Sequence, residues 1–225
     1  MGRRHPAPAC HRAVRLSDAP VSAPKRISIF PLSGALLFPG LQLPLHVFEP
    51  RYRALVKDAL ARDRRIGMIQ PQRPEEGAPL YQVGCLGKIG DVEALDDGRF
   101  NLVLKGEARF RVLRELDVIT PFRQIEGEMI AESDDDVLAP IERAGFERES
   151  RRFADRQGYR VDWDSVARLD DVSLINGVAQ IAPFDAASKQ ALLEAGGLSE
   201  RCELMVQLMQ FYGRHDGGDD RVTLQ

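Results

Sequence analysis

The chain has 225 residues, of which 44% are apolar and 29% are charged, and its formal net charge is −3. This balance is typical of a folded globular protein with one large domain or two small ones, and it excludes collagen-like and coiled-coil architectures. The net negative charge argues against a dedicated nucleic-acid binder, which needs clustered lysine and arginine to neutralise phosphates.

Cysteine spacing and the lengths of the apolar runs argue against a zinc site, a redox dithiol and a membrane-spanning helix. Cys10, Cys85 and Cys202 lie far apart without a C-x-x-C pair, so the sequence predicts neither a zinc site nor a redox dithiol. The longest apolar stretch, residues 27–48, is interrupted by three prolines, whereas a membrane helix needs about 20 consecutive apolar residues. We therefore expect a cytoplasmic protein that acts without a membrane, a metal or a cofactor.

The first two dozen residues differ from the rest of the chain. Residues 1–26 carry six basic side chains and one acid, Asp18, which leaves a net charge of −8 for residues 27–225. With four prolines and few large apolar residues, this segment cannot bury enough surface to offset its ordering entropy, and it lacks the apolar core of a signal peptide. We expect residues 1–24 to be a disordered basic tail or the product of a misassigned start codon.

Residues 25–132 show the short apolar runs of a β-rich unit. Period-two alternation and turn residues predict strands over residues 27–32, 41–48, 66–70, 81–95, 100–112 and 122–131. Pro44 places the second strand at a sheet edge or a bulge, because proline lacks a ladder donor. Pro50 begins a helix with an apolar stripe from Tyr52 to Leu60. We expect about six strands in a curled antiparallel sheet or small barrel with one helix.

The strongest strand signal follows the Asp97-Gly98 dipeptide, which predicts a hairpin turn. From Phe100 to Val112 the even-numbered residues are apolar or small, so the pattern predicts one buried face. Gly106 in the middle of this run predicts a bend or a bulge.

Residues 133–215 have the periodicity of helices instead, and residues 216–225 form a polar tail that we expect to fray. Asp134, Asp135 and Asp136 mark the change, because acidic residues favour a helix N-terminus. Apolar spacing predicts helices over residues 137–156 and 172–182, a third capped by Asp185 that runs to Leu193, and a last one from Ser199. The whole chain therefore predicts an α+β fold whose β-rich half precedes an α-helical bundle.

The segment from Phe30 to Tyr52 contains the runs FPL, LFPG, LPL and FEPRY. These runs resemble the opening of the Lon N-terminal (substrate-binding) domain family, and most of all its stand-alone bacterial members. Further matches lie at residues 83–89, 97–102, 106–110 and 189–194, followed by Arg201. The resemblance covers about residues 25–213 and implies a PUA-like β-rich subdomain followed by an α-helical bundle.

In the full-length protease this domain binds protein substrates and catalyses nothing. The resemblance therefore implies a non-catalytic module for unfolded or client proteins and peptides, accessory to proteolysis or quality control, with a separate protease or chaperone as a partner. The protease's ATPase and Ser–Lys peptidase modules lie further along than this sequence extends. The alternative is RNA binding, because PUA-like folds commonly bind RNA. Against it stands the charge of −8, although four residues supply a candidate basic strand face: Arg99, Lys105, Arg109 and Arg111.

Motifs for ATP hydrolysis and peptide cleavage are missing from the sequence. Gly87-Lys88 is followed by Ile89 instead of the hydroxyl residue of a P-loop. Ser188 and Lys189 are adjacent on a predicted helix, so their side chains point about 100° apart and form no catalytic dyad. We expect no enzymatic activity.

Phe38, Pro39 and Leu41 are the candidate peptide-binding residues. Phe38 and Leu41 flank the Pro39-Gly40 turn, and turns run over the protein surface. An apolar pair at a turn is either covered by the helical half or left as a patch for partners. We expect Pro39 and Leu41 to line a shallow groove between the two halves that accepts extended apolar segments of unfolded clients.

Overall fold

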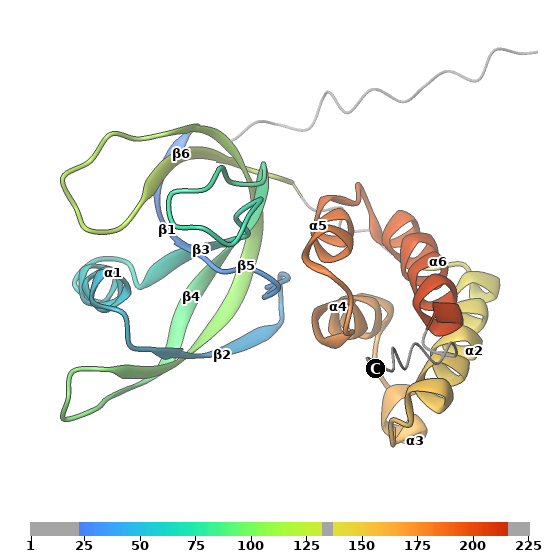
Figure 1. Cartoon of the computed structure of the whole chain (residues 1–225). Coiled ribbons are helices and arrows are strands. Elements are labelled where there is room, and N and C mark those ends of the chain that lie inside the picture. The colour runs from blue at the N-terminus through green and yellow to red at the C-terminus, as the bar shows by residue number, and fades with distance from the viewer. Residues whose placement is uncertain (1–22, 132–136, 216–225) are drawn as a thin grey trace, which may run out of the picture.

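The computed structural model describes residues 23–131 and 137–215, which form a β subdomain (residues 25–131) and a helical subdomain (residues 140–215) (Figure 1). Most of the predicted basic tail, the three aspartates at 134–136 and the predicted tail at 216–225 lie outside the described residues. The β subdomain contains β1 (Lys25–Pro31), β2 (Gln42–Val47), α1 (Pro50–Leu60), β3 (Arg65–Ile69), β4 (Val83–Ala94), β5 (Phe100–Glu115) and β6 (Gln124–Met129).

These strands form one six-stranded sheet in the order β2-β5-β4-β3-β1-β6, and an additional pairing of β5 with β6 closes β1, β3, β4, β5 and β6 into a ring. The predicted α+β fold is confirmed, and β2, with Pro44, lies at the sheet edge as predicted. The prediction of an antiparallel sheet is wrong at one pair, because β1 and β3 run parallel with Ile29 opposite Gly67. A parallel pair needs a long crossover, and here β2 and α1 supply it.

A bulge in β5 divides its apolar residues between two cores. The pairing register shifts so that Leu86 lies opposite Ala108 but Gly87 lies opposite Gly106. One extra residue in a strand exchanges the two faces beyond it. The predicted bulge at Gly106 is confirmed, but the prediction of one buried face from Phe100 to Val112 is wrong. Residues before the bulge face α1, whereas Phe110 and Val112 pack inside the ring.

The two cores of the β subdomain lie on opposite sides of the sheet. The ring interior holds residues from four strands together with Leu80: Ile27, Ile29, Ile69, Phe110 and Ile125. The other core lies beneath α1, whose stripe of Tyr52, Leu55, Val56 and Ala59 is buried as predicted. The ring has little spare room, because a Cβ atom at Gly84 would lie 2.5 Å from both the Phe110 ring and the Met68 carbonyl oxygen.

The helical subdomain contains α2 (Pro140–Gln157), α3 (Trp163–Val166), α4 (Asp171–Ile181), α5 (Ala186–Glu194) and α6 (Leu198–His215). The short helix α3 was not predicted. Aspartates begin three of these helices, and Asp185 accepts a hydrogen bond from the Ser188 amide at 2.7 Å, as its predicted capping role requires. No helix of the described residues is long and apolar enough to cross a membrane.

The two subdomains share a mixed apolar and polar interface. Three residues of the β subdomain belong to the same core cluster as the helices: Leu36, Phe38 and Val83. The buried Arg109 guanidinium of β5 donates to the carbonyl oxygens of Leu193 and Ala195 at 2.8 and 2.6 Å. In the opposite direction, the Gln190 amide of α5 donates to the Val83 carbonyl oxygen at 3.0 Å. The subdomains are therefore held together by hydrogen bonds to backbone as well as by apolar contact.

Candidate functional site

The structure places the predicted peptide-binding turn at the subdomain interface. Gly40 has a φ of +81°, the left-handed conformation that the predicted turn uses. Phe38 is 0% exposed, and the Arg201 guanidinium carbon lies 5.0 Å from the centre of its ring. Leu41 is partly buried against the helical core. In this structure the helices cover Phe38, so of the three predicted binding residues Pro39 and Leu41 keep exposed surface.

A second candidate is an apolar groove on the helical subdomain, which we call the helical groove. Its volume is about 540 Å³. It is lined by Phe146, Glu147, Ser150, Phe153 and Ala154 of α2, by Tyr159, Arg160, Val161, Trp163 and Val166 of the following segment, by Leu174, Val178, Ile181, Ala182 and Pro183 at α4, and by Met209 of α6. Thirteen of these sixteen residues are apolar or aromatic, which suits an apolar ligand.

Large apolar side chains are exposed around the helical groove. Ile181 is 79% exposed and Tyr159 is 49% exposed. The Arg151 guanidinium stacks over the face of the Trp163 ring in a cation–π contact, with its central carbon 4.4 Å from the ring centre. At the floor, Met209 is buried and its sulfur faces the Ser150 hydroxyl at 3.6 Å. Methionine and aromatic side chains together give a surface that adapts to different apolar partners.

Sequence reasoning missed the helical groove because its walls come from four separate segments. One signal was available, because Tyr159, Val161 and Trp163 alternate in the stretch between the predicted helices at residues 137–156 and 172–182. A further signal lies in α4, where Leu174 and Ile181 fall outside the predicted stripe and widen its apolar arc.

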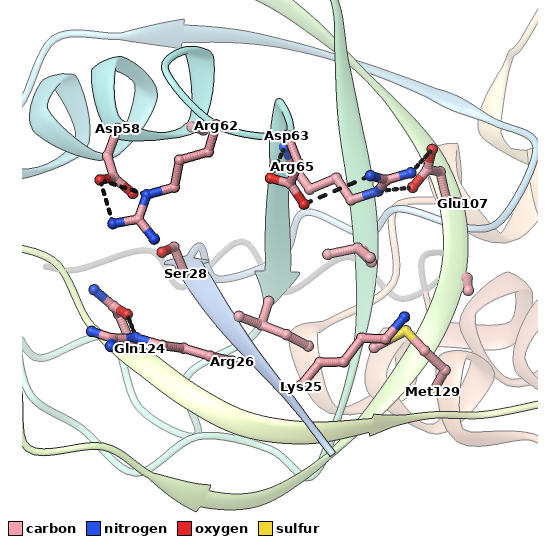
Figure 2. A pocket seen from close by; sticks show the side chains of 14 residues that line it. Lys25, Arg26, Ser28, Asp58, Arg62, Asp63, Arg65, Glu107, Gln124 and Met129 are labelled. Carbon is pink, nitrogen blue, oxygen red and sulfur yellow. Dashed lines mark hydrogen bonds and ion pairs between the residues drawn. The ribbon is translucent and has the colours of Figure 1, made fainter. Parts of the chain in front are cut away.

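The third candidate is a polar cavity at one end of the closed ring, which we call the ring-end pocket (Figure 2). Its volume is about 480 Å³. Its polar lining is Lys25, Arg26, Ser28, Asp58, Arg62, Asp63, Arg65, Glu107 and Gln124, and its apolar lining is Ile27, Ala59, Leu86, Ala108 and Met129. Lys25 and Arg26, the last two basic residues of the positively charged segment 1–26, are the first residues of β1.

Each acidic residue of the ring-end pocket has an arginine partner. Asp58 pairs with Arg62 at 3.1 Å, and Arg65 pairs with Glu107 at 2.6 Å and with Asp63 at 3.6 Å. The hydrogen bond from Arg65 to Glu107 raises the pKa of the guanidinium above its ordinary value. With four basic and three acidic side chains, the lining carries a net charge of +1.

The alternative basic face for RNA is not formed. Arg109 points into the subdomain interface, Arg99 pairs with Asp97 at 2.6 Å, and Arg111 pairs with Glu128 at 3.3 Å. These contacts neutralise or bury three of the four cations that the sequence placed on one strand face.

The side chains of Ser188 and Lys189 make hydrogen bonds to different partners and do not form a catalytic pair. The Lys189 ammonium donates to the carbonyl oxygens of Gly34 and Gln180, and partial burial lowers its pKa. The Ser188 hydroxyl instead faces the Tyr212 hydroxyl at 3.3 Å. Burial raises the pKa of the Cys202 thiol to about 11, so this cysteine is a poor nucleophile at neutral pH. Within residues 23–131 and 137–215, no group of three or more His, Cys, Asp or Glu side chains is arranged to hold a metal ion.

The chain matches the family model of the ATP-dependent protease La (LON) substrate-binding domain over residues 26–210. It is 28% identical over 197 residues to Lon protease 2 of Myxococcus xanthus, covering 83% of this chain and 24% of that protein. It is also 31% identical over 196 residues to Lon protease 2 of Sorangium cellulosum, covering 81% of this chain and 24% of that protein. The chain thus spans about a quarter of the length of the curated relatives that it matches.

Solved structures show the same fold. A Lon N-terminal domain protein from Xanthomonas campestris superposes with a TM-score of 0.63 at 24% identity, covering 83% of this chain and 98% of that one. The N-terminal domain of Mycobacterium avium complex Lon protease gives a TM-score of 0.63 at 20% identity with the same coverage. The resemblance inferred from the sequence motifs is confirmed by these matches.

Proposed function

The chain belongs to the family of ATP-dependent protease La (LON) substrate-binding domains, and from this premise we propose that it is a non-catalytic module that binds protein substrates. In this proposal the helical groove holds an extended apolar segment of an unfolded protein. The module acts in the cytoplasm as an accessory to proteolysis or protein quality control, and it passes its substrates to a separate protease or chaperone.

The observation that carries the proposal is the exposed apolar lining of the helical groove within a family defined by substrate binding. Ligand sites are concave and mostly apolar, with volumes of about 300 to 1,000 Å³. The groove, at about 540 Å³, falls within this range. Unfolded proteins expose the apolar side chains that folded proteins bury, so an apolar groove selects for them without reading a particular sequence.

Ile181 is the side chain with the most surface to gain from such a contact. It lies at the end of α4 and is 79% exposed. Full burial of an isoleucine side chain contributes about 1.5 to 3 kcal/mol. Loss of this contact therefore predicts a decrease in affinity of roughly tenfold or more.

The turn at Pro39 remains a second predicted contact. In the described conformation Leu41 offers only part of its side chain, and Phe38 offers none. A client that used all three residues would have to separate the subdomains. The helical groove needs no such rearrangement, which is why we propose it as the main site.

The experiment compares Ile181→Ser with a matched control, Ile141→Ser. Ile141 is also 79% exposed and also lies on a helix, but it does not line the groove. Fluorescence anisotropy measures binding to a labelled protein kept unfolded by reduction and carboxymethylation, and circular dichroism checks the fold. We expect about tenfold weaker binding for Ile181→Ser and less than twofold change for Ile141→Ser. Equal binding by both variants would contradict the role of the groove.

A further inference from the structure

We propose that the ring-end pocket binds the C-terminal residue of a protein substrate, taking its carboxylate at Arg26, Ser28 and Arg62 and its apolar side chain against the neighbouring apolar lining. The inference rests on the proposed function, because the ligand is a protein substrate. It adds a second recognised group, the C-terminal carboxylate of the substrate, which the helical groove does not bind.

The local structure explains why these three polar residues share one side of the pocket. Residues two apart on a strand point to the same face, so Arg26 and Ser28 both project from the face of β1 that α1 covers. Arg62 follows the end of α1 and lines the same pocket. In the view of Figure 2 the Ser28 hydroxyl lies between the guanidinium groups of Arg62 and Arg26. Two guanidinium groups and a hydroxyl give the donors that a carboxylate accepts.

Arg26 is held in position by a buried neutral partner. Its Nε donates to the Gln124 side-chain oxygen, and Gln124 is 2% exposed. Gln124 in turn donates to the Thr120 hydroxyl at 3.1 Å, which fixes the orientation of its amide. Because Gln124 carries no charge, it orients the guanidinium of Arg26 without neutralising it. Because this hydrogen bond uses only Nε, the two terminal nitrogens of Arg26 can donate to a ligand.

The charge of the pocket matches one monovalent anion. Its three acids already pair with Arg62 and Arg65. Among the described residues, Lys25 and Arg26 form no ion pair with an acidic side chain. The net charge of +1 balances a single carboxylate, whereas a phosphate ester that carries two charges would leave an excess negative charge.

The apolar lining distinguishes between two sources of carboxylate. Leu86, Ala108 and Met129, each partly exposed, line the same cavity as the cations, and the cavity as a whole has a volume of about 480 Å³. A single ligand residue that contacts both the cationic lining and the apolar lining needs a carboxylate and an apolar side chain together. An internal aspartate or glutamate offers only the carboxylate, while an apolar C-terminal residue offers both. The pocket therefore favours a free C-terminus that ends in an apolar residue.

The test uses the full chain and three peptides that carry a neutral fluorophore. Each is an octapeptide of glycine and serine that ends in Ala-Leu with a free carboxylate, in Ala-Leu-amide, or in Ala-Glu-amide. Anisotropy should show about tenfold tighter binding of the free carboxylate than of either amide, the size of a charge-assisted hydrogen-bond pair. The preference should weaken as salt rises, because exposed charges are screened.

Variants locate this preference. Arg26→Met and Ser28→Ala should each reduce the ratio of acid to amide affinity, to less than threefold for Arg26→Met. Arg114→Met should leave it unchanged, because Arg114 is exposed, pairs with Glu126 and does not line the pocket. Ile181→Ser should weaken binding of the unfolded protein without changing the ratio.

The outcomes separate this inference from the proposed function. Equal binding of acid and amide by the unaltered chain, or an undiminished preference in folded Arg26→Met, overturns the pocket assignment. If the unfolded protein still binds in that case, the proposed function stands. If neither the peptides nor the unfolded protein bind, both proposals fail. Equal binding of the free Leu and Glu-amide peptides assigns a general acid site and overturns the C-terminal assignment.

Discussion

Replacement of Arg109 by methionine tests how the helical subdomain is held against the sheet. Arg109 is 3% exposed and donates to the carbonyl oxygens of Leu193 and Ala195 at the end of α5. Methionine keeps an unbranched apolar stem of similar reach but supplies no donor. The substitution therefore removes the hydrogen bonds while keeping most of the packing.

The magnitude follows from the two carbonyl oxygens that lose their charged donor. A hydrogen bond to a charged group contributes about 1.5 to 3 kcal/mol, and each buried acceptor left without a donor costs about 1 to 3 kcal/mol. Relaxation of the last turn of α5 recovers part of this loss. We expect Arg109→Met to lower the free energy of unfolding by roughly 3 kcal/mol. For a chain of this size that corresponds to a fall in Tm of about 6 to 12 °C.

The assay is urea unfolding followed by circular dichroism, with Arg114→Met as the control. Arg114 lies on the same strand in an exposed ion pair with Glu126, so its loss should cost less than about 1 kcal/mol. Hydrogen exchange adds a local readout, because the amides of α5 should lose more protection than those of β3. A loss below 1 kcal/mol for Arg109→Met, or equal losses for both variants, would refute the role of Arg109 at this interface.

Three further predictions test the ring, a helix cap and the turn. Gly84→Ala should cost more than about 2 kcal/mol in urea unfolding, because its Cβ atom would lie 2.5 Å from the Phe110 ring. Asp185→Ala should cost about 1 kcal/mol at pH 7. The hydrogen bond from the Ser188 amide lowers the pKa of Asp185. The cap's stabilisation is therefore complete above the ordinary aspartate pKa and is lost as pH falls through the lowered pKa. Melting temperatures measured against pH should show the variant and the unaltered chain converging in acid. Leu41→Asp should destabilise by about 2 kcal/mol, because Leu41 packs on the helical core, and a folded variant with undiminished binding of unfolded protein would contradict the predicted contact at this turn.

Local patterns in the sequence predicted the elements well because local physics determines them. Asp97-Gly98 sits in the hairpin turn between β4 and β5, with Gly98 at a φ of +80°. Asp185 caps its helix, and Pro50 begins α1. In each case one or two residues impose a backbone conformation or satisfy a free amide, so no distant partner needs to be known.

The candidate sites were harder to predict because they are assembled from distant segments. The helical groove joins α2, α3, α4 and α6, and the ring-end pocket joins residues from both ends of the β subdomain. Arg26 illustrates the difficulty. In sequence it ends a basic run, yet its hydrogen bond to Gln124, 98 residues away, makes it part of a cavity. Only the antiparallel pairing of β1 with β6 brings the two residues together.

Arg109 shows how one local irregularity changes a functional interpretation. Strict alternation along β5 places Arg109 beside Lys105 and Arg111, as a face for phosphates. The bulge beyond Gly106 adds one residue, so Arg109 turns to the opposite side and reaches the end of α5. The negative partial charge at a helix C-terminus favours a cation there. The glycine that marks the bulge in the sequence therefore also explains why a candidate RNA contact became the link between the two subdomains.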